Sequence, residues 1–177
     1  IDVQIYQGSY ADIANWLKTG AVEMGFLSNS SAIGFDFEPL YDDTLICLAP
    51  ADYQPKRPGC IHANELQGQP FVSQLSDVDA DIQSYFRINA LQVNSRCYIA
   101  DDQSMISMVS CGQGLAIMPE LMFKHGADYC GCQVLRLEPV AKRSIGVACL
   151  AKSGLSPAGK QFLNHLRRYS KTMAMVE

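Results

Sequence analysis

The alternation of strand-like and helix-like segments constrains the fold of this chain more than any other feature. Residues 1–5 alternate between apolar and polar side chains, which is typical of a half-buried strand. Ile13, Trp16 and Leu17 then recur at helical spacing, and the apolar run 22–27 reads as a second strand. A strand, a helix and a strand within so few residues predict a βαβ unit with parallel strands. We therefore expect an α/β fold.

Capping residues mark where several helices begin and end. Ser9 with Asp12 three residues later has the form of a capping box, and Gly20 is suited to end the same helix. Ser156 followed by Pro157 predicts the start of the last helix. Ser76 with Asp79 resembles another capping box.

The remaining pattern continues the alternation to the C-terminus. Further strands are predicted at 37–49, 70–73, 97–100, 115–118, 134–137 and 144–150, and further helices at 63–66, from 76 onward, and from Asp101 or Asp102 to Gly112.

Charge and hydropathy exclude two classes of function. The net charge is −4 and the isoelectric point is near 5.3, whereas a chain that binds nucleic acid by itself usually has clustered lysine and arginine. Arg167, Arg168 and Lys171 form the one small cluster, in the last turns of a predicted helix, where cations suit the helix dipole. No apolar run approaches the ~20 residues of a membrane helix.

Seven cysteines in mostly apolar contexts indicate free thiols and a reducing, cytoplasmic location. Cys130 and Cys132 with His125 offer three metal ligands, but structural zinc sites use four, so we expect no metal and no cofactor. Cys60 with His62 is a weaker candidate.

No catalytic constellation stands out. The chain has no Gly-x-Ser-x-Gly nucleophile elbow, and the adjacent carboxylates Asp42-Asp43 and Asp101-Asp102 are not spaced as an acid–base pair. Gly112 and Gly114 follow a helix, which fits a helix end and a tight turn better than a dinucleotide site. We expect the chain not to be an enzyme.

Polar side chains occur at three predicted junctions between strands and helices, namely 7–9, 73–74 and 102–104. In open parallel sheets, ligands bind beyond the carboxyl ends of strands, where helix N-termini attract anions. Helix capping explains each junction taken alone, and a shared ligand cleft explains all three together.

The ordered series of motifs resembles the effector-binding domain of LysR-type transcription regulators. The matching stretches, in the family's order, are 3–8, 17–25, 39–45, Asn64-Glu65-Leu66, Asn89 with Arg96, and 112–120.

The resemblance implies two α/β lobes joined by two crossing strands, as in type 2 periplasmic binding proteins. The first lobe would be residues 1–46 plus 149–177, and the second 47–148. The family's usual first strand and helix would precede residue 1, so the first lobe would be N-terminally truncated. Either its neighbouring segments repack or another chain fills the gap.

The resemblance further implies that a small, possibly anionic metabolite binds between the lobes. Carried over by position, the effector-binding residues would be Gln7, Ser9, Leu27, Ser28, Ser73, Asp102, Gln103, Met118 and Pro119. The domain would form homodimers or tetramers and would reach DNA only through a helix-turn-helix outside this chain, with no membrane contact.

Three other interpretations stay open. A solute-binding protein of a transport system has the same fold, and so do some enzymes. A redox-sensing version of the family uses a reactive cysteine, for which Cys97 and Cys111 lie in the corresponding part of this chain, without the basic neighbours that would activate them.

Overall fold

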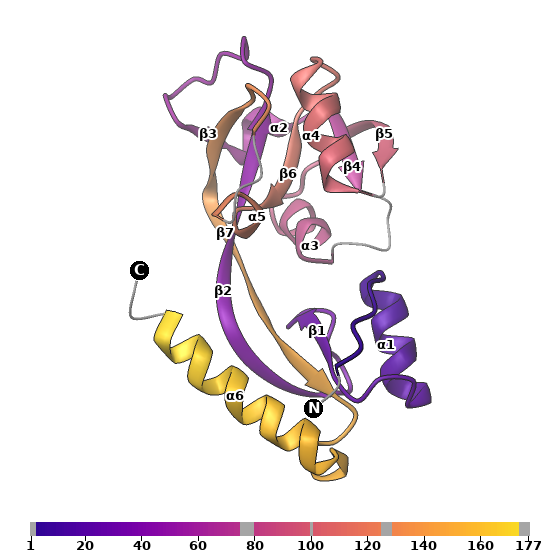
Figure 1. Cartoon of the computed structure of the whole chain (residues 1–177). Coiled ribbons are helices and arrows are strands. Elements are labelled where there is room, and N and C mark those ends of the chain that lie inside the picture. Colours follow the sequence, from indigo (N-terminus) through magenta and orange to yellow (C-terminus); the bar gives the residue numbers. More distant parts are fainter. Residues whose placement is uncertain (1–2, 75–79, 100, 125–128, 174–177) are drawn as a thin grey trace. The chain divides into compact units, whose positions relative to one another are not determined.

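The first helix forms where its capping residues predict it. α1 spans Tyr10–Thr19; Ser9 caps it by accepting from the Asp12 N–H, and the Asp12 carboxylate accepts from the Ser9 N–H. Gly20 ends the helix with a left-handed backbone (φ 72°). These features come from a computed structural model of the chain, which describes residues 3–74, 80–99, 101–124 and 129–173 (Figure 1).

The predicted opening strand, residues 1–5, does not form in its described part. Residues 3–5 are not a strand, and residues 3–8 are exposed. The next strand, β1 (Gly25–Ser28), pairs antiparallel with β7, so the predicted parallel βαβ unit does not form here. The alternation of residues 1–5 is suited to a strand, but a strand needs a neighbour for its backbone hydrogen bonds.

Two long strands dominate the larger sheet, whose order is β1-β7-β2-β6 with β3 paired to β7. β2 spans Asp36–Ala49 and β7 spans Gln133–Cys149 (Figure 1). The sequence predicted β7 as two separate strands, and the structure joins them into one. β3 (Cys60–His62) runs parallel to β7, and β6 (Ala116–Pro119) runs antiparallel to β2.

A parallel βαβ unit does occur, but later in the chain. β4 (Pro70–Gln74) and β5 (Asn94–Ile99) form a two-stranded parallel sheet, and α3 (Ala80–Ile88) connects them. The predicted capping box at Ser76 and Asp79 lies outside the described residues.

Three of the other helices, α2, α4 and α6, follow their predicted signals, whereas α5 and a short 3-10 turn were not predicted. α2 spans Ala63–Leu66, α4 spans Asp102–Ser110, α5 spans Leu121–Lys124 and α6 spans Pro157–Met173, with a short 3-10 turn at Lys152–Gly154. Asp101 caps α4, and Ser156 caps α6 by accepting from the Gly159 N–H.

The chain divides into two units, Ile1–Asp42 with Arg143–Glu177, and Asp43–Lys142. We call them unit 1 and unit 2. β2 and β7 both continue from one unit into the other, and the sequence had placed the divisions within the same two strands. Each unit has buried clusters of its own: Leu17, Leu27, Val147 and Leu163 contribute to those of unit 1. Unit 2 has two clusters, one around Phe71 and one around Met105. No helix among the described residues is both long and apolar enough to cross a membrane.

Candidate functional site

A cluster of polar side chains lies on β4, β5 and the start of α4 in unit 2. The hydroxyls of Ser73 and Ser95 are hydrogen bonded at 2.7 Å, one from each of the paired strands. Both side chains are half-buried. The pair is therefore held in place by the sheet while part of its surface stays accessible.

The next residue of β4 connects this cluster to α4. The Gln74 side-chain amide donates to the Asp102 carboxylate at 2.7 Å, and both residues are half-buried. Asp101 caps the same helix by accepting from the Ser104 N–H at 2.8 Å. That backbone hydrogen bond lowers the pKa of Asp101, so the carboxylate is ionised at neutral pH.

The cluster combines fixed donors and acceptors beside a helix N-terminus. Gln103 is exposed on the first turn of α4, and its amide lies 4.0 Å from the Cys130 sulfur. Such an arrangement suits recognition of a small polar molecule by several hydrogen bonds.

Two other predicted residues of unit 2 are buried. Met118 is fully buried in the cluster around Met105, and Pro119 is also buried at the end of β6. Contact of either with an effector stays a prediction.

In unit 1 the four predicted residues fall into two groups. Gln7 is exposed beside Ser9, whose hydroxyl is engaged with Asp12 at 2.6 Å. Leu27 and Ser28 are fully buried, and the Ser28 hydroxyl is hydrogen bonded with Ser30 at 2.9 Å. The structure therefore places Ser73, Asp102 and Gln103 in unit 2, where Asp102 is bonded to Gln74, the residue after Ser73, and it describes the unit 1 residues separately.

Two members of the polar cluster were absent from the predicted site. Gln74 was noted at a junction but not assigned to the site, and Ser95 was not noted. Ser95 is the second residue of β5 and lies before the predicted strand 97–100, so only its hydrogen bond with Ser73 reveals it.

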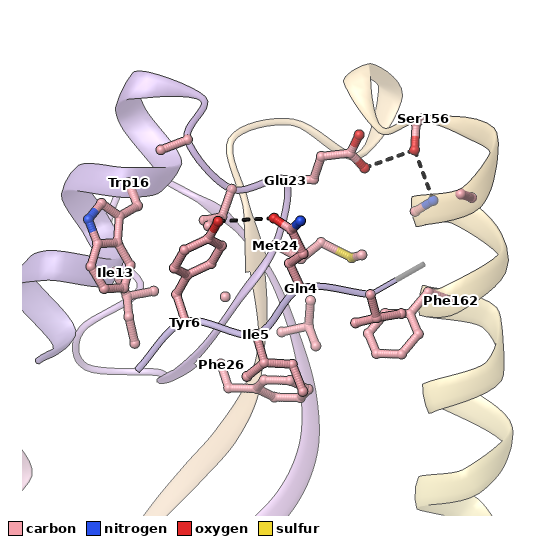
Figure 2. Close-up of a pocket in the computed structure, with 17 residues that line it drawn as sticks. Gln4, Ile5, Tyr6, Ile13, Trp16, Glu23, Met24, Phe26, Ser156 and Phe162 are labelled. Atoms are coloured by element: carbon pink, nitrogen blue, oxygen red, sulfur yellow. Dashed lines mark hydrogen bonds between the residues drawn. The ribbon is translucent and has the colours of Figure 1, made fainter. Parts of the chain in front are cut away.

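Unit 1 contains a pocket of about 530 Å³ that none of the nine predicted residues lines (Figure 2). Its walls come from residues 3–6, α1, the segment 21–26, Val147 and the start of α6. Figure 2 shows Tyr6 hydrogen bonded to Gln4, and Glu23 accepting from Ser156. Most of the remaining lining side chains are apolar, such as Ile13, Trp16 and Phe162.

The pocket is open to solvent, because two of its lining side chains, Ile5 and Phe26, are 90% and 50% exposed. Repacking of the neighbouring segments and filling of the gap by another chain both stay predictions.

The described residues contain no group of three histidine, cysteine, aspartate or glutamate side chains placed to hold a metal ion. His125 lies outside the described part of the chain. His62 uses its Nδ1 atom to accept from the Asn64 N–H and so caps α2. All seven cysteines are free thiols, and burial raises the pKa of Cys47 far above its usual range.

Comparison with known families gives one match over nearly the whole chain. The family model described as the LysR substrate binding domain matches residues 1–171. No curated protein matched the sequence.

Several solved structures share the fold. The regulatory domain of Synechocystis PCC6803 CcmR in complex with 2-PG has a TM-score of 0.83 at 18% identity, covering 93% of this chain and 81% of that chain. The effector binding domain of QuiR in complex with shikimate has a TM-score of 0.82 at 24% identity, covering 94% and 80%. The oxidized form of OxyR has a TM-score of 0.77 at 16% identity, covering 95% and 81%.

Proposed function

Since this chain belongs to the LysR substrate binding domain family, whose members are ligand-sensing regulatory domains, we propose that it senses a small hydroxylated metabolite. Binding would change how the full regulator engages DNA through a helix-turn-helix outside this chain. The polar cluster of unit 2, formed by Ser73, Gln74, Ser95, Asp102 and Gln103, is the observation that carries the proposal.

The chemistry of this cluster favours a ligand with hydroxyl groups. Asp102 is a carboxylate acceptor fixed by Gln74, and the two serine hydroxyls can both donate and accept. Asp101 already satisfies an N–H group at the start of α4 and adds negative charge there. A ligand hydroxyl can donate to Asp102, whereas a bare anion would meet repulsion from both carboxylates.

The ligands of two structural relatives supply the first compounds to test. QuiR binds shikimate and CcmR binds 2-PG in their solved complexes. These two compounds are therefore the first probes, and the anionic ligand expected from the sequence is tested by the same screen. We keep Gln7, Ser9, Leu27, Ser28, Met118 and Pro119 in the proposed effector site because the family resemblance assigns them.

The rest of the proposal concerns the whole regulator. We infer a non-enzymatic, cytoplasmic protein that acts as a homodimer or tetramer, and the seven free thiols are consistent with a reducing compartment. The effector can shift the regulator between two arrangements only by binding one more tightly than the other.

A thermal-shift titration tests the site. The 177-residue chain is titrated with shikimate, 2-PG and a panel of hydroxylated and simple anionic metabolites. A true effector at about 100 times its Kd should stabilise the fold by roughly 2.7 kcal/mol. Gln103→Trp should abolish that stabilisation by filling the cluster, and Ser9→Trp should do so if unit 1 contributes as proposed.

Gln83→Trp is the matched control, because Gln83 is exposed on α3 and outside the cluster. It should leave the shift unchanged. A full shift retained by Gln103→Trp would remove the unit 2 cluster from the effector site. A solute-binding protein could bind the same ligand, so DNA retardation by the full-length protein, with and without ligand, separates the two functions.

A further inference from the structure

The turn before β7 contains two cysteines, Cys130 and Cys132, with one residue between them. Residues 129–132 form a tight turn closed by a hydrogen bond from the Cys132 N–H to the Tyr129 carbonyl at 2.8 Å. Cys130 and Gly131 at its centre both have left-handed backbones, with φ of 48° and 79°. A non-glycine residue rarely adopts this conformation, and the pair matches the pattern of a type I′ turn.

The turn brings the two cysteines within the range of a disulfide. Consecutive Cα atoms are ~3.8 Å apart, and a turn holds residues two positions apart closer than the roughly 7 Å of an extended chain. Disulfides are found at Cα separations of about 4.4–6.8 Å. The turn is therefore compatible with a disulfide between Cys130 and Cys132.

Both thiols contact α4 of the same unit. Cys132 is half-buried and donates to the Ile106 carbonyl at 3.7 Å, and Cys130 is exposed with its sulfur 4.0 Å from the Gln103 amide nitrogen. Gln103 and Ile106 are one helical turn apart, so the two sulfurs lie along one stretch of the helix.

We propose that Cys130 and Cys132 form a reversible dithiol–disulfide couple that a low-molecular-weight disulfide oxidises. In the first step the Cys130 thiolate attacks the external disulfide, forming a mixed disulfide and releasing one thiolate. In the second step the Cys132 thiolate attacks the Cys130 sulfur and releases the second thiolate. In sum, two protein thiols and one disulfide give one intramolecular disulfide and two small thiols.

The environments of the two cysteines set this order of steps. Burial is the main cause that raises the pKa of Cys132, and the nearby Cys130 thiolate adds to the rise, so formation of the mixed disulfide at Cys130 removes a charge that opposes ionisation of Cys132. Cys130 is the exposed member of the pair, so it meets the oxidant first.

Oxidation would also alter the proposed effector site, and this consequence rests on the proposed function. Drawing the Cys130 sulfur toward Cys132 removes its contact with Gln103 on the first turn of α4. The redox state of the turn would then tune effector affinity through that side chain.

Peptide mapping tests the couple without any effector. The reduced domain is incubated with oxidised glutathione, alkylated and digested with trypsin, which cleaves after Lys124 and Arg136. The peptide 125–136 then contains both thiols, whereas Cys111 is in a different peptide. We expect most of peptide 125–136 to be lighter by two hydrogen atoms and unalkylated, and dithiothreitol to reverse this change.

Variants separate the two steps. Cys132→Ser should trap glutathione on Cys130, Cys130→Ser should leave Cys132 largely unmodified, and Cys111→Ser should behave as wild type. Stable glutathionylation of Cys130 in the wild-type chain, or a cross-link between Cys130 and Cys111, would overturn the proposal. Both readouts are independent of ligand binding, so failure of the effector screen does not affect them.

Discussion

Tyr85 has a buried hydroxyl group that makes no hydrogen bond within the described part of the chain. The side chain is 5% exposed in the core cluster around Phe71, and its hydroxyl has no hydrogen-bond partner among the described residues. Burial raises the pKa of Tyr85 to about 12, so the group stays neutral at all ordinary pH values. A buried polar atom without a partner costs about 1–3 kcal/mol.

Tyr85→Phe should therefore leave the free energy of unfolding unchanged or raise it by about 1 kcal/mol, as measured by urea denaturation. The ring and its tilted contact with Phe86 stay intact, because only the oxygen is removed. Tyr169→Phe is the control: Tyr169 is 58% exposed, and the substitution should have almost no effect. A loss of more than about 1 kcal/mol in Tyr85→Phe would mean that the hydroxyl is bonded.

At the same scale, three of the five residues of the polar cluster had been assigned to the site from the sequence. Ser73, Asp102 and Gln103 were found because they lie at strand–helix junctions, where ligands commonly bind. Ser95 was missed because its partner depends on register: a register shift lies between Phe71 and Val72 where β4 pairs with β5. No local pattern in the sequence encodes that irregularity, so no alternation rule could have aligned the two serines.

Within unit 1, a carboxylate joins α6 to β2. The Glu38 side chain accepts from Arg167 on α6 with both carboxylate oxygens, and from Lys152 at 2.8 Å. Glu38 is 18% exposed, and its hydrogen bonds from Arg167 are the main cause that lowers its pKa to about 2, from an ordinary value of 4.5. This bidentate contact fixes the helix to the sheet strand that it covers.

Glu38→Gln should lower the free energy of unfolding by roughly 1–3 kcal/mol at neutral pH, since the cations themselves are about 40% exposed and partly screened. The folded-state pKa lies below the unfolded one, so the contribution is present above pH 4.5 and is lost as the pH falls toward 2. Denaturation across that range should show the wild-type advantage disappearing. Asp52→Asn, at an exposed position, is the control, and its effect on the free energy of unfolding should not depend on pH in this range. If Glu38→Gln and Asp52→Asn were equally stable at pH 7, Glu38 would not have the stabilising role given to it.

Elements with local signals were predicted well, and elements that need a partner were not. Ser9 with Asp12, and Ser156 before Pro157, start helices by hydrogen bonds within a few residues, so the chain itself contains the information. The opening strand failed because its alternation lacks an adjacent strand. β7 was divided in two because the polar stretch near Lys142 reads as a break, although pairing with strands on both sides keeps it extended.

For the molecule as a whole, the units differ in how completely they bury their apolar side chains. In unit 2 the β4–α3–β5 unit and the ends of the long strands enclose two clusters. In unit 1 the pocket remains open beside residues 3–6, where Val3, Ile5 and Tyr6 are each at least 59% exposed (Figure 2). Contiguous exposed apolar surface of this kind binds hydrophobic molecules and promotes association.

The isolated 177-residue chain should therefore bind the dye 8-anilinonaphthalene-1-sulfonate in its native state and self-associate as its concentration rises. Ile5→Ser and Phe26→Ser should each reduce the dye fluorescence and the apparent mass in analytical ultracentrifugation. The free energy of unfolding should fall by less than about 0.5 kcal/mol in Ile5→Ser, whose side chain is 90% exposed, and by roughly 1–2 kcal/mol in Phe26→Ser, whose side chain is half-buried.

Val140→Ser is the matched control, because Val140 is 59% exposed in unit 2 and lies outside the pocket. This variant should bind as much dye as the unmodified chain. If all three serine variants reduced the dye signal equally, scattered apolar residues rather than the pocket would be its source. If none did, the side chains around residues 3–6 would be covered in solution. If only Ile5→Ser and Phe26→Ser reduced the dye fluorescence, the dye-binding apolar surface would belong to unit 1. The proposed effector site, by contrast, depends on the polar cluster of unit 2.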